Sequence, residues 1–336
     1  MLTNKSIIYA GIGLVIIAFF LCNLLYGSVS IPASQVMDIL LGKGAEKAAW
    51  ENIVLYSRLP QAVTALLAGA ALAVSGLLLQ TLFQNPLAGP SILGISSGAD
   101  LGVAIVVLYS GGIAGSGFSI LSAAFAGAMI ILALIVYFSG KVKSNVLVLI
   151  IGMMIGYLAS SVISILNSYA SSENIRLYVL WGMGNFSGVS IRQLPLYCIS
   201  VSAGLFASIL LIKPLNALLL GERYAANLGI SILRTRILIL VCTGLLTALV
   251  TAFCGPVSFI GLAVPHVARM VLGTSNQRLL LPATLLSGSA VALLCNLLTL
   301  IPFGNSMLPL NAVTPLLGAP VIIYVILNKK NTAYFN

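Results

Sequence analysis

NALLLGERYAANLGI, residues 216–230, is the longest soluble-looking stretch in the second half of a chain that otherwise reads as lipid-soluble. Its apolar residues surround Glu222 and Arg223 as in a short amphipathic helix, and Gly229 is placed as a helix stop. Lys213 and Arg234 flank it before long apolar segments begin, which is typical of a cytoplasmic loop. The stretch is either a connector helix lying on the bilayer or a docking helix for a soluble subunit.

Composition places the chain in a membrane. Hydrophobic residues make up 60% and charged residues only 7%, whereas a soluble domain is roughly 25% charged. The 16 Lys and Arg residues against 6 Asp and Glu are scattered at the ends of apolar segments. They form no basic face, so we expect no nucleic-acid partner. No two of the five cysteines form a C-x-x-C pair, which favours buried reduced thiols.

A membrane span needs about 20 apolar residues, and this rule predicts ten spans in an all-α polytopic protein with one transmembrane domain over residues 1–336. The spans are expected near 7–26, 58–82, 92–110, 116–138, 145–168, 194–213, 236–254, 258–272, 279–301 and 312–327. Ten spans place both termini on one side, which the positive-inside rule identifies as cytoplasmic. The basic residues then inside are Lys5, Lys141, Lys143, Lys213, Arg223, Arg234, Arg236, Arg269, Arg278, Lys329 and Lys330.

Glycines cluster inside the predicted spans and indicate closely packed helices. Gly152 and Gly156 form one G-x-x-x-G spacing. GPSILG at 89–94 is echoed by GPVSFIG at 255–261, and the topology puts the first inside and the second outside. This placement predicts an inverted internal repeat.

Catalytic motifs are missing from the sequence. It contains no phosphate-binding G-x-x-x-x-G-K-[ST] loop and no H-E-x-x-H, and His266 is the only histidine. We therefore predict no enzyme, no cofactor and no metal site, and energy from ATP must come from another chain. His266 is interpreted as a packing or capping residue. Asp100 is the one acid inside a span: it is either a proton or cation site, or a carboxylate satisfied by Ser96, Ser97 or a neighbouring helix.

Several ordered stretches together resemble the FecCD-type permeases of binding-protein-dependent ABC importers, a family that includes the vitamin B12 permease BtuC. They are RLP at 58–60, GAALAVSGLLLQTLFQNPLAGPSILGISSGA at 69–99, LWGMGNFSG at 180–188, ALLLGERYAANLGI at 217–230, GPVSFIGLAVPHVARMVLG at 255–273 and TPLLGAPVIIYVI at 314–326. The resemblance covers essentially the whole chain. It implies a BtuC-like fold of ten helices and a permease dimer, formed with a second copy or a paralogue. It also implies two ATP-binding cassette subunits and a periplasmic or lipid-anchored substrate-binding protein.

The resemblance also assigns roles to residues. The coupling helix to the ATPase matches residues 216–230, in particular Leu219, Gly221, Glu222, Arg223, Ala225, Leu228 and Gly229. The cytoplasmic gate matches Asn85, Leu87, Ser144 and Asn145. Arg58 matches an outward arginine that docks the binding protein.

One region departs from the family pattern. Members commonly carry A-D-x-x-A-R and then E-L-P-V-G before the last span. Here the first run ends Cys295, Asn296, Leu297, Leu298, Thr299, Leu300, and the second is Met307, Leu308, Pro309, Leu310, Asn311. Losing acid and base together avoids a lone buried charge, but Leu300 replaces the second docking arginine. Lys43, Lys47 or Arg192 could then assist Arg58.

The expected function is the permease subunit of an ABC importer in the bacterial cytoplasmic membrane. Its cargo is a bulky chelate or cofactor: an iron–siderophore, haem or cobalamin. The alternative is an ion-coupled secondary transporter that uses Asp100.

Overall fold

The structure is a computed structural model that describes residues 2–109, 117–142, 144–300 and 308–327. Within these ranges the chain is helical and contains no strand, so the predicted all-α class is confirmed. Lys143, Met307, Lys329 and Lys330, which the sequence analysis used, lie outside the described residues.

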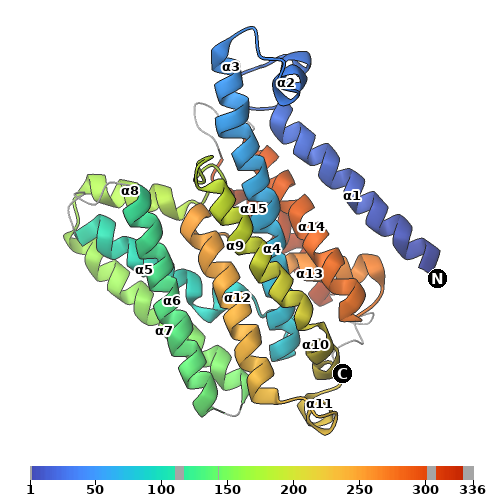
Figure 1. Ribbon diagram of the computed structural model, residues 1–336. Helices are drawn as coiled ribbons and strands as arrows, with labels where there is room; N and C mark the ends of the chain where they lie inside the picture. The colour runs from blue at the N-terminus through green and yellow to red at the C-terminus, as the bar shows by residue number, and fades with distance from the viewer. Residues whose placement is uncertain (1, 110–116, 143, 301–307, 328–336) are drawn as a thin grey trace.

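The helices of the first half are α1 (Leu2–Leu25), α2 (Ala33–Leu40), α3 (Ala48–Ile53), the π-helical η1 (Val54–Arg58), α4 (Leu59–Phe83), the 3-10 turn η2 (Pro90–Leu93), α5 (Ile95–Ala104), the π-helical η3 (Ile105–Tyr109), α6 (Gly117–Lys141) and α7 (Asn145–Tyr169). The second half contains α8 (Ser172–Gly182), α9 (Leu194–Leu210), α10 (Ile212–Leu218), α11 (Glu222–Asn227), α12 (Ile232–Cys254), α13 (Ile260–Leu272), α14 (Gln277–Thr299) and α15 (Leu310–Leu327). The short helices α2 and α3 lie at one end of the bundle, and α10 and α11 lie at the other (Figure 1).

Helix α4 is the core of the bundle. In its most apolar 18-residue window 83% of the residues are buried, against 28% in α6 and α7 and 11% in α1. Glycines allow this central position because they let backbones meet. A Cβ added to Gly76 would lie 1.6 Å from the carbonyl oxygen of Gly261 in α13, and one added to Gly69 would lie 2.2 Å from that of Gly288 in α14. The small residues that predicted close packing therefore set the distances between α4 and its neighbours.

The ten predicted spans all fall on apolar helices. Six helices are long and apolar enough to cross a membrane, and α9 with α10 makes a seventh if this pair, bent by 51°, is one span. The other three are the shorter segments Ile95–Tyr109, Ile260–Leu272 and Leu310–Val325. A helix of 13 residues is only about 20 Å long at 1.5 Å per residue, less than the ~30 Å hydrocarbon core. By itself, α13 is therefore too short to cross the hydrocarbon core.

The two echoing motifs meet in the fold. The segment after α12 leads through Phe259, which has a φ of +66°, into α13, and the turn η2 leads through Gly94, with a φ of +75°, into α5. A Cβ added to Gly261 would lie 2.8 Å from Cδ of Pro90, so the motifs are in contact beside α4. The inverted repeat itself stays a prediction.

Candidate functional site

The candidate site lies at the end of the bundle that carries α10 and α11. The sequence predicts a single amphipathic helix over residues 216–230, but the structure divides this stretch into the end of α10, a turn, and α11. The division occurs at Gly221, whose φ of +99° is a conformation that other residues rarely adopt. Leu219 is half-buried in the turn.

The predicted stop at Gly229 is confirmed. Gly229 has a φ of +82°, its N–H donates to the carbonyl of Ala226 at 2.9 Å, and the N–H of Ile230 donates to that of Ala225 at 3.1 Å. This pair of bonds is a Schellman motif, which satisfies carbonyls left free at a helix end. Ala225 is fully buried at this point, so the end of α11 is fastened to the bundle.

One face of the segment is apolar and uncovered. Leu220, Tyr224 and Leu228 are 62%, 68% and 64% exposed, and Arg223 is exposed beside them. We call these three side chains the exposed row: Tyr224 and Leu228 are four residues apart on α11 and at its C-terminal end, whereas Leu220 precedes the break at Gly221. Exposed apolar side chains gathered on one short segment are typical of a protein contact, which favours docking over a helix that merely connects.

Glu222 joins this segment to the bundle. Its Oε1 accepts a hydrogen bond from Nδ2 of Asn145 at 2.5 Å and lies 3.6 Å from Nη2 of Arg236. The Arg236 side chain is 4% exposed, whereas that of Glu222 is 42% exposed. The carboxylate therefore forms the solvent-facing side of a partly buried ion pair.

The two partners of Glu222 reach further helices. Asn145 Nδ2 also donates to the carbonyl of Leu82 at 2.9 Å, and Arg236 Nη1 donates to that of Val142 at 2.8 Å. Asn145 begins α7, Leu82 is near the end of α4, and Arg236 is in the first turns of α12. We call Glu222, Asn145 and Arg236 the latch, because together they tie α11 to α4, α7 and α12. From the sequence alone, Arg236 is identified only as a topology signal.

The predicted gate residues Asn85 and Leu87 lie in the loop after α4. Asn85 Oδ1 accepts from the N–H of Leu87 at 2.9 Å, and Leu87 is 43% exposed. Two residues that the sequence analysis did not assign to the gate hold this loop. Gln84, at a φ of +46°, donates from Nε2 to the carbonyl of Leu218 at 3.0 Å. His266 Nε2 lies 2.8 Å from the carbonyl oxygen of Pro86.

Ser144 and Asn145 are adjacent in sequence but differ in surroundings. Ser144 is exposed and occupies the N-cap of α7 without a side-chain capping bond, whereas Asn145 belongs to the latch. The structure thus brings Asn145 and Glu222 together, and it links the Asn85 loop to α10 through Gln84. The gating roles stay predictions.

Arg58, the predicted docking residue, lies at the opposite end of the bundle. It is 5% exposed and donates to the carbonyls of Leu24 and Leu25 at 2.8 Å each, and to that of Val29. Its guanidinium therefore caps the end of α1 in this structure. Docking stays a prediction, and a binding protein would meet more accessible cations nearby, such as Lys43, whose Nζ lies 3.8 Å from Asp38.

Asp100 lies in α5 with its Oδ1 buried and without a hydrogen-bond partner among the described residues. Ser96, one of the residues expected to satisfy it, instead contacts Thr251, with 3.5 Å between their hydroxyl oxygens. In the part of the chain that the structure describes, no group of three His, Cys, Asp or Glu side chains could hold a metal ion.

The positions that depart from the family pattern hold amide networks. Asn296 Nδ2 donates to Asn23 Oδ1 at 2.6 Å, and its Oδ1 accepts from Gln61 Nε2 at 3.0 Å. These bonds connect α14, α1 and α4. Hydrogen bonds between neutral amides thus occupy a place where the sequence comparison showed only lost charges.

Asn311 is the centre of a second network of amide hydrogen bonds. Its Nδ2 donates to the carbonyls of Gly182 at 2.9 Å and Pro256 at 2.7 Å, and its Oδ1 accepts from the N–H of Ser258 at 3.3 Å. Buried backbone groups without a partner are costly, and this side chain satisfies three backbone groups where the irregular segment before α13 meets α8 and α15.

Comparison with known proteins agrees with this architecture. The model of the FecCD transport family matches residues 14–328. The vitamin B12 import system permease protein BtuC of Klebsiella pneumoniae subsp. pneumoniae is 34% identical over 320 residues, which cover 95% of this chain and 93% of that protein. BtuC of Salmonella paratyphi A is 37% identical over 278 residues, covering 82% and 84% of the two chains.

A solved structure described as a metal-chelate type ABC transporter in an inward-facing conformation superposes with a TM-score of 0.83. It has 29% sequence identity and covers 97% of this chain and 99% of its own. The family model and the BtuC relatives both extend over most of the chain, and the arrangement of α1 to α15 has a counterpart of the same size. The chain therefore belongs to the FecCD transport family and is a multi-pass membrane permease of the ABC importer type.

Proposed function

We propose that this permease imports a bulky chelate or cofactor, of the class of iron–siderophores, haem or cobalamin, and that ATP hydrolysis in two partner subunits drives the import. The permease acts as a dimer, with a second copy or a paralogue, and receives its cargo from a substrate-binding protein on the outer side. The positive-inside rule supports cytoplasmic termini in this proposal, and Tyr9 of α1 donates to the carbonyl of Leu279 in α14 at 2.6 Å, so the start of α1 lies beside the start of α14.

The latch is the observation that carries the proposal. An ATPase that binds α11 and shifts it also shifts Glu222. Glu222 accepts a hydrogen bond from Asn145 and forms an ion pair with Arg236. Because these residues lie at the cytoplasmic ends of α7 and α12, and Asn145 also bonds the end of α4, movement of α11 is delivered to three helices at once. Coupling of this kind requires a packed element with two arrangements, and the latch supplies the mechanical connection.

The exposed row of Leu220, Tyr224 and Leu228 suits the groove of a soluble ATPase. An amphipathic helix that inserts its apolar row into a groove is a common mode of protein recognition. Arg223 beside the row adds a positive charge, which would orient the partner.

Helix α7 suits the wall of the passage. Its outer half exposes Ser160, Ser161, Ser164 and Ser168, and Tyr157 and Tyr169 are 66% and 88% exposed. Hydroxyl groups on the surface of a span mark a face turned toward protein or water more often than toward lipid. A passage with hydroxyls and few charges suits a cargo whose metal is already wrapped by its own ligand.

The relatives support a chelated cargo. The BtuC proteins are permeases for vitamin B12, and the superposed structure is described as a metal-chelate type transporter. Cobalamin, a cobalt chelate, satisfies both descriptions and is the first cargo to test.

The decisive experiment reconstitutes the chain with its ATP-binding subunit and binding protein in proteoliposomes and measures ATP-driven uptake of cobalamin, a ferric siderophore and haem. We expect uptake of one cargo that stops when ATP is withdrawn and persists when ion gradients are collapsed. Binding-protein affinity for the three cargoes, measured separately, identifies the same one if the proposal holds. Failure of all three would refute the cargo class.

Buried Asp100 supports a second candidate, an ion-coupled transporter. That function predicts uptake that follows an ion gradient without ATP and disappears in Asp100→Asn. The ABC importer predicts that Asp100→Asn retains ATP dependence, so one pair of measurements separates the two.

A further inference from the structure

An apolar groove runs along α1 on the side that faces α13 and α14. It has a volume of about 460 Å³, which falls in the roughly 300 to 1,000 Å³ range of small-molecule sites. On α1 it extends from Ile8 through Gly11 and Val15 to Phe19, and Val267 and Val271 of α13 form its far wall. We infer that this groove holds an acyl chain of a phospholipid from the cytoplasmic leaflet, with an anionic headgroup at its basic end.

The length of the groove fits one leaflet. Ile8 and Phe19 are eleven residues apart, which is about 16 Å along a helix. Half of the ~30 Å hydrocarbon core is about 15 Å. The groove therefore matches the depth that one acyl chain occupies, and its walls are almost entirely carbon.

A glycine opens the groove. A Cβ built at Gly11 has nothing within 4 Å, so packing between helices does not explain the glycine at this position. It leaves room on the surface of α1 where the groove passes. Gly13, two residues further, also has nothing within 4 Å of a built Cβ but does not line the groove, which makes it a matched control.

The charge at the cytoplasmic end complements an anionic headgroup. Lys5 lies one turn before Ile8 on the same side of α1, and Arg278 adjoins Leu279, whose carbonyl accepts from Tyr9 of α1. None of the six acidic residues of the chain occurs in residues 1–25 or 260–299. A phosphate placed there meets cations from two helices without a competing carboxylate from α1, α13 or α14.

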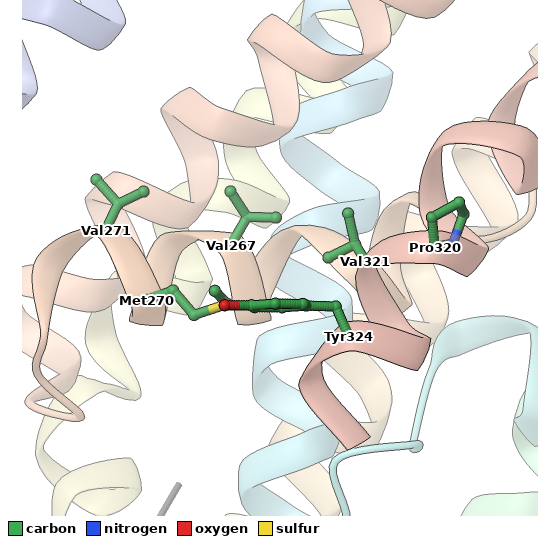
Figure 2. A pocket seen from close by; sticks show the side chains of 6 residues that line it. All are labelled: Val267, Met270, Val271, Pro320, Val321 and Tyr324. Carbon is green, nitrogen blue, oxygen red and sulfur yellow. The ribbon is translucent and has the colours of Figure 1, made fainter. Parts of the chain in front are cut away.

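A second hollow favours a lipid with two chains. It lies between α13 and α15, has a volume of about 340 Å³, and shares Val267 and Val271 with the first. Figure 2 shows Tyr324 of α15 pointing across it toward α13. The two valines thus form a ridge with an apolar hollow on either side, which the two chains of one phospholipid can straddle.

The test uses the full-length chain in nanodiscs of phosphatidylcholine that contain a small fraction of phosphatidylglycerol with a photoreactive acyl chain. Labelled peptides are mapped by mass spectrometry. We expect labelling of α1 and α13 to exceed that of α6, whose exposed Ile130, Leu134 and Tyr137 serve as an apolar reference surface outside the groove. Equal labelling of α6 would overturn the proposal.

Two variants and one control, Gly13→Phe, test the groove and its basic end separately. Gly11→Phe fills part of the groove and should lower its labelling about fifteenfold, because it displaces about two methylenes of the acyl chain and each contributes a factor of about four, while Gly13→Phe should retain the labelling. Lys5→Gln with Arg278→Gln leaves the groove open and should remove the preference for phosphatidylglycerol over a phosphatidylcholine probe with the same photoreactive chain. Unchanged labelling in Gly11→Phe overturns the proposal, and so does a change of oligomeric state in Gly11→Phe by native mass spectrometry, which would make the groove a subunit contact.

Discussion

Replacement of Glu222 by glutamine tests the latch most directly. The side chain keeps its shape and an oxygen that can accept from Asn145, but it loses the charge that faces Arg236 at 3.6 Å. Coulomb's law gives about 1 kcal/mol for this pair in water and about 5 kcal/mol at an effective dielectric of 20. Because the Glu222 side chain is 42% exposed, solvent screening keeps the contribution near the lower limit, at about 1 to 2 kcal/mol.

This energy corresponds to a factor of about 5 to 30 in the equilibrium between latched and unlatched arrangements. With the partner subunits in proteoliposomes, we expect Glu222→Gln to lower the cargo transported per ATP hydrolysed by a factor in this range. Assembly and ATPase activity should persist, since Leu220, Tyr224 and Leu228 stay unchanged. Arg223→Gln is the matched control: it also removes one charge from α11, and it should change ATPase affinity without changing the ratio.

A double-mutant cycle separates the pair from other effects. Arg236 is 4% exposed, so Glu222→Gln leaves a buried cation without its carboxylate, and Arg236→Gln leaves the carboxylate without its cation. The double change leaves neither charge, so its effect should fall short of the sum by about 1 kcal/mol or more. The latch would be refuted as the transmitting contact if Glu222→Gln left the cargo transported per ATP unchanged. It would also be refuted if the effects of Glu222→Gln and Arg236→Gln on this ratio were strictly additive.

Three further predictions concern the scaffold. Gly76→Ala should abolish the folded yield of the protein in detergent, because its Cβ would meet the Gly261 carbonyl at 1.6 Å; Gly140→Ala, with nothing within 4 Å, should leave the yield unchanged. Asn296→Ala should lower the free energy of unfolding by about 1 to 3 kcal/mol, because its buried amide partners lose their bonds, and a melting temperature equal to wild type would contradict this. Arg58→Lys keeps the charge but cannot bond three carbonyls in a fork, so it should lower the melting temperature; a loss of binding-protein affinity at unchanged stability would instead support docking.

The sequence predicts the apolar segments because burial in lipid demands apolar helices. All ten fall on helices, but among the described residues only six helices are long enough to cross a membrane alone, and α9 with α10 makes a seventh as a bent pair. The sequence also predicts close packing from glycines such as Gly76, since only a missing Cβ allows the observed approach to Gly261. The stop at Gly229 follows from local backbone preference and is confirmed. The apolar segments, the small residues and the helix stop can be predicted because each depends on the local sequence or on its composition.

Features that depend on contacts between distant residues were not predictable. Gly221 reads equally well as a helix residue or as a break, and only the structure shows its positive φ. Nothing near Arg236 in the sequence indicates Glu222 as its partner, and nothing near Arg58 reveals that its guanidinium caps α1. His266 was interpreted correctly as a packing residue, but its contact, the carbonyl of Pro86, is 180 positions away.

The amide networks have a consequence for consensus design, which replaces each residue by the one most common in its family. Glycine, the usual residue at position 311, would delete an amide that serves the carbonyls of Gly182 and Pro256 and the N–H of Ser258. Each backbone group left unsatisfied costs about 1 to 3 kcal/mol. A replacement intended to stabilise the protein would therefore weaken it.

Restoring the family's residue at position 296 would also weaken the protein, for a different reason. Aspartate, the usual residue there, would turn an acceptor toward Asn23 Oδ1, which now receives a hydrogen bond at 2.6 Å, and the arginine that commonly accompanies it is Leu300 in this chain. The replacement would oppose two oxygen atoms and bury a charge without a counter-ion. The acid and the arginine of the family pattern can therefore be restored here only as a set.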